Sequence, residues 1–144
     1  MVILYIFALF TWYQVSAAPA QTLNSRVCGV DDESLFKLHA GDLKWPKTRL
    51  TWSIKSYPWK NEVSESRTEQ ILQEAFQAYA SHTPLEFEKV CSTCTADIVI
   101  GFVSRAHAGC ENHPFDGQGG TLAHADAPTS GQIHFDFDEV WTEK

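Results

Sequence analysis

Apolar and polar residues alternate along the chain with two different periods. Leu50, Trp52 and Ile54 alternate with polar neighbours, and this period of two predicts a strand with one buried face. From about 66 to 79 the period lengthens. Apolar residues then fall on one side of a helix: Ile71, Leu72, Ala75, Phe76 and Tyr79. The sequence therefore predicts a strand followed by one long amphipathic helix.

The ends of this helix carry their own signals. Ser66, with Glu69 three residues later, predicts a capping box, and Ser64 is an alternative cap. The Thr83-Pro84 pair predicts the end of the helical region, because the residue before a proline is driven out of the helical conformation.

Apolar residues after the helix predict the remaining strands. Leu85–Val90 predicts a second strand, and the nearly continuous apolar run of Asp97–Val103 predicts a central one. After a polar, glycine-rich loop, two short strands are predicted at Thr121–Ala125 and Gln132–Phe137. The order of elements indicates an α+β fold, a twisted mixed β-sheet with one long helix packed on it.

The N-terminal segment reads as a signal peptide. Residues 2–12 are almost wholly apolar and the small residues of 15–18 follow, which predicts cleavage after Ala17 and secretion to the extracellular space. A membrane anchor is the alternative, although the run is short for about 30 Å of hydrocarbon. No membrane association is expected once residues 1–17 are removed.

Composition limits the classes of partner that the chain can bind and indicates the state of its cysteines. A length of 144 residues suits one domain, and the net charge of -7 argues against a nucleic-acid partner. The carboxylate excess suits a hard cation such as calcium as well as plain solubility. In a secreted chain disulfides are expected, and four cysteines allow several pairings among which the sequence does not choose: Cys28, Cys91, Cys94 and Cys110.

Two groups of candidate metal ligands lie between residues 107 and 139. The first is four of the six histidines, His107, His113, His124 and His134. Zinc binds imidazole nitrogen, but a single histidine is more often a surface or packed residue. The second is the Asp116–Gly120 loop with Asp136 and Glu139, which suits calcium or forms an ordinary Asp-Gly turn.

A family resemblance connects these motifs. The runs Pro114–Ala125 and His134–Thr142 closely resemble the matrix metalloproteinase catalytic domain, a zinc endopeptidase of the metzincin type. Shorter matches are Trp45, Leu50–Trp52, Ala75-Phe76, Thr83–Phe87 and Ala96–Ile98. The resemblance covers about Trp45 to Thr142. It implies that 44–144 is a partial zincin-like catalytic domain acting on extracellular proteins.

The resemblance implies a structural zinc. Three histidines match its ligands: His107, His124 and His134. The family places an aspartate two residues after the first histidine, where this chain has Gly109. The loop here is longer, and Glu111 falls at the aspartate position when counted back from Asp116. Cys110 is the other candidate, and Glu111 is favoured because a carboxylate then replaces a carboxylate.

The resemblance also implies a calcium site and a substrate-binding edge. Asp116, Asp136 and Glu139 match the calcium carboxylates, and three residues match the backbone-carbonyl positions: Gly117, Gly119 and Thr121. The second calcium loop of the family is shortened here. Leu122 and Ala123 match the edge strand on which an extended protein substrate, such as an extracellular matrix protein, is bound. The alternative is an edge that stays solvated.

Cys28 resembles the cysteine switch, in which a pro-segment thiolate occupies the open position on the catalytic zinc. Val27 separates Cys28 from Arg26, and Asp31 replaces the usual proline, so a structural cysteine is the alternative. On this interpretation residues 18–43 are a short pro-segment, and the enzyme is made as a zymogen.

The zinc-binding H-E-x-x-H motif does not occur in the 144 residues. No residue is therefore assigned to catalysis, and the chain alone is predicted to be inactive. The first hypothesis is a matrix-type zinc metalloendopeptidase in truncated form. The alternative is a non-catalytic secreted module that binds zinc and calcium.

Overall fold

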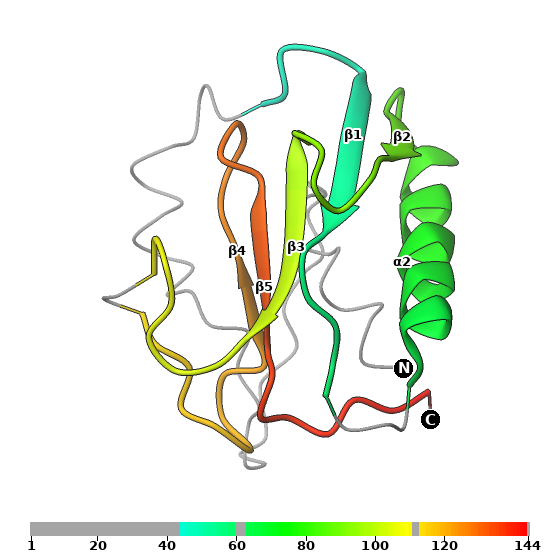
Figure 1. Ribbon diagram of the computed structural model, residues 1–144. Helices are drawn as coiled ribbons and strands as arrows, with labels where there is room; N and C mark the ends of the chain where they lie inside the picture. The colour runs from blue at the N-terminus through cyan, green and yellow to red at the C-terminus, as the bar shows by residue number, and fades with distance from the viewer. Residues whose placement is uncertain (1–43, 60–62, 111–112, 144) are drawn as a thin grey trace, which may run out of the picture.

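A five-stranded mixed sheet forms the centre of the fold (Figure 1). The computed structural model describes residues 44–59, 63–110 and 113–143. The described elements are β1 (Arg49–Ile54), α2 (Glu65–Ala80), β2 (Glu86–Lys89), β3 (Ile98–Val103), β4 (Ala123–Ala125) and β5 (Gln132–Asp136). The predicted signal peptide, pro-segment and Cys28 lie outside the described residues.

The strands follow the order β2-β1-β3-β5-β4. β1 pairs in parallel with β2 and β3, β3 pairs in parallel with β5, and β4 runs antiparallel to β5. The predicted α+β class with a mixed sheet and one helix is confirmed. The apolar run of β3 lies in the middle of the sheet, and β4 forms one of its edges.

The helix begins one residue earlier than the period predicts and ends one residue later. Its N-cap is Ser64, whose hydroxyl oxygen accepts a hydrogen bond from the Arg67 N–H at 3.2 Å. The capping box on Ser66 is therefore wrong, because Ser66 already lies inside the first turn, and the alternative cap is the one used. Past the C-terminus, the Thr83 hydroxyl donates to the Tyr79 carbonyl at 3.1 Å and satisfies one of the final acceptors.

The register places the apolar strand residues on one face of the sheet, against α2. Partners in adjacent strands share a face, and this face carries eight buried side chains: Leu50, Trp52, Ile54, Ile98, Ile100, Phe102, Ile133 and Phe135. Phe76 of α2 packs on Trp52 and Phe87, with ring centroids 4.9 and 4.7 Å apart. Burying side chains of this size stabilises the fold by about 1.5–3 kcal/mol each.

The opposite face of the sheet carries the polar positions. The residues that alternate with the apolar ones are Ser53 in β1, Gly101 in β3, His124 in β4, and His134 and Asp136 in β5. Because the side-chain period of a strand is two, the pattern that builds the core also directs both strand histidines away from it. The candidate metal-binding side chains of the strands therefore lie on the face opposite α2.

One disulfide closes the turn that follows β2. Cys91 and Cys94 are bonded, and the Cys94 N–H also donates to the Cys91 carbonyl at 3.0 Å. The Lys55 ammonium donates to the carbonyls of Ser92 and Cys94, which attaches this turn to the end of β1. With this pair formed, Cys110 is present as a buried thiol.

Candidate metal centre

His124 and His134 face each other directly across two strands. They are register partners in the antiparallel β4–β5 pair, where opposite side chains lie about 4.5–5.5 Å apart at Cβ. Both are buried, at 9 % and 8 % exposure. His124 Nε2 and His134 Nδ1 are 3.1 Å apart. The sheet itself therefore brings two imidazole nitrogens to one point.

The third histidine comes from the loop after β3. His107 Nε2 lies 3.1 Å from His124 Nε2 and 3.1 Å from His134 Nδ1, so the three nitrogens form an equilateral triangle. His107 Nδ1 lies 2.8 Å from the Arg105 carbonyl oxygen, which accepts from it. This contact places the proton on Nδ1 and leaves the Nε2 lone pair directed at the triangle, as in many zinc-bound histidines.

The triangle has the dimensions of one face of a zinc coordination shell. Ligand nitrogens at about 2.0–2.1 Å in tetrahedral geometry are separated from one another by about 3.3 Å. The observed 3.1 Å edges are close to this value. Three neutral imidazoles whose nitrogens meet at one point cannot all hydrogen-bond one another, whereas a cation accepts all three lone pairs. The residues present therefore fit a zinc ion.

Burial keeps the strand histidines in the ligand form. Burial, with a further contribution from the positive charge that His134 and His107 would carry, lowers the pKa of His124 to about 4. Burial likewise lowers the pKa of His134, followed by the effect of His107. Both imidazoles are neutral at physiological pH, which is the state that binds metal.

A sulfur atom joins the three nitrogens. Cys110 Sγ lies 3.6 Å from His134 Nδ1, and one donor atom from each of four residues lies within 4.8 Å of all the others: His107, Cys110, His124 and His134. Glu111, the favoured fourth ligand, lies outside the described residues, so its role stays a prediction. His113 is exposed and does not belong to the group.

The predicted calcium ligands share a second loop. Asp136 is fully buried and Glu139 is 7 % exposed, and their carboxylates accept from the N–H groups of Gly117 and Gly119 respectively. Asp116 accepts from the Thr121 N–H at 3.1 Å. Across the described ranges these carboxylates do not form a second close group of donor atoms. Calcium therefore stays a prediction, supported by two buried carboxylates beside one loop.

Glycine is required in this loop for two reasons. Gly117 and Gly119 have φ of 90° and 86°, which side-chain-bearing residues rarely adopt. At Gly120, with φ of 77°, an added Cβ would also lie 2.0 Å from Asp116 Oδ2. The glycine run therefore allows the backbone to turn tightly around the Asp116 carboxylate.

Arg105 connects the two candidate sites, and the sequence patterns did not point to it. Its carbonyl accepts from both the His107 ring and the Phe115 N–H, the latter at 3.1 Å. Its guanidinium donates to the Asp116 carbonyl at 2.9 Å. Phe115 in turn stacks on His107 and His124, with centroids 5.1 and 4.6 Å away. The one unusual feature of Arg105 is a φ of 54°, which no sequence signal predicts.

β4 presents one open edge. It pairs only with β5 among the described strands, and the carbonyl of Leu122 is used inward, accepting from the Asp136 N–H at 2.9 Å. In an antiparallel pair the inward and outward backbone groups alternate. Ala123 and Ala125 therefore direct their N–H and C=O groups to the open side, whereas the backbone groups of His124, between them, are directed toward β5.

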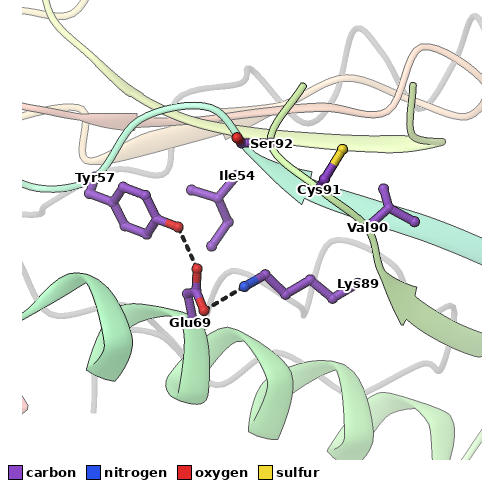
Figure 2. Close-up of a pocket in the computed structure, with 7 residues that line it drawn as sticks. All are labelled: Ile54, Tyr57, Glu69, Lys89, Val90, Cys91 and Ser92. Carbon is purple, nitrogen blue, oxygen red and sulfur yellow. Dashed lines mark hydrogen bonds and ion pairs between the residues drawn. The ribbon is translucent and has the colours of Figure 1, made fainter. Parts of the chain in front are cut away.

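A cavity lies on the other face of the sheet. It measures about 370 Å³ and lies between β1, α2 and the turn after β2, as Figure 2 shows. Inside it the Glu69 carboxylate accepts from the Tyr57 hydroxyl and pairs with the Lys89 ammonium. Burial first, then Glu69, raises the pKa of Tyr57, and Lys89 is the main cause of the lowered pKa of Glu69. These groups are hydrogen-bonded or ion-paired with one another and do not contact the metal centre.

Comparison with known families finds a match over the sheet and the helix. Residues 44–144 match the peptidase family described as matrixin. The chain belongs to the matrixin family. This confirms the resemblance to matrix metalloproteinases. The family implies zinc, and the group of three histidines and Cys110 in this matrixin could hold a metal ion.

Named relatives support the same assignment. The matrixin is 43 % identical over 135 residues to matrix metalloproteinase-C of Caenorhabditis elegans, covering 93 % of this chain and 22 % of the relative. It is 42 % identical over 140 residues to interstitial collagenase of Bos taurus, covering 92 % and 29 %. It is 41 % identical over 118 residues to neutrophil collagenase of Homo sapiens, covering 80 % and 24 %. The chain thus spans less than a third of the length of these relatives.

Within the described residues, no helix combines the length and apolar character needed to cross a bilayer.

Proposed function

We propose that this matrixin is part of a secreted zinc metalloendopeptidase that cleaves extracellular matrix proteins, and that the described residues bind metal and position the substrate. The observation that carries the proposal is the triangle of imidazole nitrogens on the face of the sheet opposite α2. The names of the collagenase relatives support an extracellular protein substrate.

The proposed zinc would fix the substrate edge in place. His124 belongs to β4, His134 to β5, and His107 to the long loop after β3. An ion bound to all three attaches a short edge strand to the centre of the sheet and to the loop. A rigid edge binds an extended peptide with less loss of conformational entropy than a mobile one. The peptide would add beside Ala123 and Ala125.

The proposed calcium would act on the preceding loop. Residues 116–121 lead into β4. The buried carboxylates of Asp136 and Glu139, which come later in the chain, accept hydrogen bonds from backbone N–H groups of that loop. A divalent cation at this place would neutralise carboxylates that are otherwise costly to bury. The expected ligands are three carboxylates and three backbone carbonyls: Asp116, Asp136 and Glu139, with Gly117, Gly119 and Thr121.

Hydrolysis requires groups that these 144 residues do not contain. A zinc with four protein ligands has no open position for a water molecule, so the histidine triangle is a structural site. No H-E-x-x-H occurs to hold a second zinc and supply the general base. The chain by itself is therefore expected to cleave no peptide. The signal peptide at 1–17 and the pro-segment at 18–43 with its Cys28 switch belong to the same proposal.

Sequencing the transcript beyond the codon for Lys144 tests the enzymatic proposal. An in-frame H-E-x-x-H motif downstream is expected. A stop codon at that point would overturn it and favour the second candidate, a non-catalytic secreted module that binds zinc and calcium. The same histidine triangle supports that candidate, so elemental analysis should find about one zinc per chain in either case.

A further inference from the structure

The family ligand that this chain lacks has a replacement close by. A carboxylate is expected two residues after His107, but that position is Gly109, which has no donor side chain. Cys110 is the next residue, and its Sγ lies beside the histidine triangle, 3.6 Å from His134 Nδ1. The described residues place no other thiol or carboxylate in this group.

We propose that the Cys110 thiolate is the fourth ligand of the zinc, so that this matrixin has a His₃Cys site in place of three histidines and a carboxylate. The inference rests on the structural zinc of the proposed function. It replaces Glu111 as the favoured fourth ligand. It also makes the site softer than a carboxylate-containing one, because thiolate sulfur is a more polarisable donor than oxygen.

The distance from Cys110 to His134 agrees with a mixed sulfur and nitrogen shell. With zinc–sulfur at about 2.3 Å and zinc–nitrogen at about 2.0–2.1 Å, tetrahedral geometry separates sulfur from nitrogen by about 3.6 Å. Cys110 Sγ and His134 Nδ1 are 3.6 Å apart. This sulfur–nitrogen edge is longer than the 3.1 Å nitrogen–nitrogen edges, as the longer zinc–sulfur bond requires, and the sulfur lies within 4.8 Å of the other two nitrogens.

A local turn brings the sulfur to this position. The Cys110 N–H donates to the His107 carbonyl at 3.0 Å, which closes a tight turn with Gly109 at φ 86°. The turn places His107 and Cys110 three residues apart, which is a common spacing for a pair of zinc ligands. Aspartate would be strained at Gly109, whereas Cys110 sits where the turn returns the chain toward the sheet.

The Cys110 sulfur is a buried thiol that lies beside the histidine nitrogens. Cys91 and Cys94 are bonded to each other, and Cys110 is a thiol at 9 % exposure. Its sulfur faces imidazole nitrogens on the polar face of the sheet. A buried thiol in an apolar core would instead be surrounded by carbon atoms. The sulfur is therefore directed at the same point as the three nitrogens.

Cobalt substitution of the purified full chain tests the proposal directly. Cobalt(II) bound to a thiolate absorbs in the near ultraviolet by sulfur-to-metal charge transfer, and cobalt bound to nitrogen and oxygen alone does not. The wild-type chain, loaded with one equivalent of cobalt without oxygen, is expected to show this band. Cys110→Ser and Cys110→Asp are expected to lose it. Cys28→Ser and Glu111→Gln, the matched controls, are expected to keep it.

Zinc affinity, measured by competition with a chelator, gives a second readout. Cys110→Ser should weaken binding at least tenfold, Cys110→Asp should recover part of the loss, and Glu111→Gln should bind like wild type. Circular dichroism identifies any variant that does not fold, and the wild-type and Cys28→Ser spectra decide the question without the Cys110 variants.

Each outcome separates this proposal from the proposed function. A wild-type chain that binds one cobalt with no charge-transfer band overturns the thiolate ligand and leaves the zinc site standing. Loss of affinity in Glu111→Gln with none in Cys110→Ser assigns the fourth ligand to Glu111. A band that disappears in Cys28→Ser assigns the sulfur to Cys28. A wild-type chain that binds neither zinc nor cobalt overturns the structural zinc itself.

Discussion

His134→Ala tests the metal centre at its most connected member. His134 Nδ1 lies 3.1 Å from both other imidazole nitrogens and 3.6 Å from the Cys110 sulfur. The substitution removes the donor that contacts all the others, so bound zinc would keep at most three of the four protein ligands. Zinc is expected to stop stabilising the folded chain.

The magnitude follows from mass action. A ligand at 100 times its dissociation constant adds about 2.7 kcal/mol to the free energy of unfolding. For a domain of this size, 1 kcal/mol corresponds to a shift of about 4–8 °C in Tm. Zinc should therefore raise the Tm of wild type by about 10–20 °C, and should raise that of His134→Ala by less than about 3 °C.

The assay is thermal unfolding followed by tryptophan fluorescence, with and without zinc after chelator treatment. His113→Ala is the matched control, because His113 is exposed and does not belong to the cluster. It should retain the full zinc-dependent shift. An equal shift in His134→Ala and wild type would refute the assignment, since zinc would then be bound elsewhere. A wild-type chain that shows no shift would refute the stabilising role of the metal.

Three further predictions concern the fold. Phe76→Ala, which removes a ring at 3 % exposure between α2 and the sheet, should lower the free energy of unfolding by about 3–5 kcal/mol in urea titrations. Ser64→Ala should cost about 1 kcal/mol by the same measurement and Ser66→Ala less than about 0.5 kcal/mol, because only Ser64 caps the helix; equal costs would contradict the cap. Pairing with Lys89 lowers the pKa of Glu69 in the folded state. The ionised Glu69 therefore contributes its full stabilisation above the unfolded pKa of about 4.3, and this stabilisation is lost as the pH falls through the lower pKa of the folded state. Glu69→Gln should therefore reduce the loss of stability measured between neutral and acidic pH. If this variant loses as much stability at acidic pH as wild type, the ion pair is refuted.

The cavity and the metal centre lie on opposite faces of the sheet, which separates their effects. Glu69, Tyr57 and Lys89 line the α2 face, whereas the three imidazoles lie on the other. Substitutions at Glu69 should alter stability without changing zinc affinity, and substitutions at His134 should alter the response to zinc. A double variant should show additive effects, because the two groups share no contact.

Local patterns in the sequence determined the elements and their faces. The period of two in Leu50, Trp52 and Ile54, and the helical period after residue 66, depend only on which side of a strand or helix must be buried. The same alternation placed His134 on the polar face of its strand. The matching motifs covered enough of the chain to indicate the matrixin family. That resemblance assigned the three histidines to zinc and the glycine loop to calcium.

Only the tertiary structure decided which residues meet. The strand order β2-β1-β3-β5-β4, the pairing of His124 with His134, and the choice of Cys91 and Cys94 as the disulfide all join positions whose contact no local period encodes. The sulfur of Cys110 reaches the histidines because a turn after His107 directs it there. Periodicity fixes the direction of a side chain relative to its own element, whereas register and loop closure fix its distance from side chains of other elements.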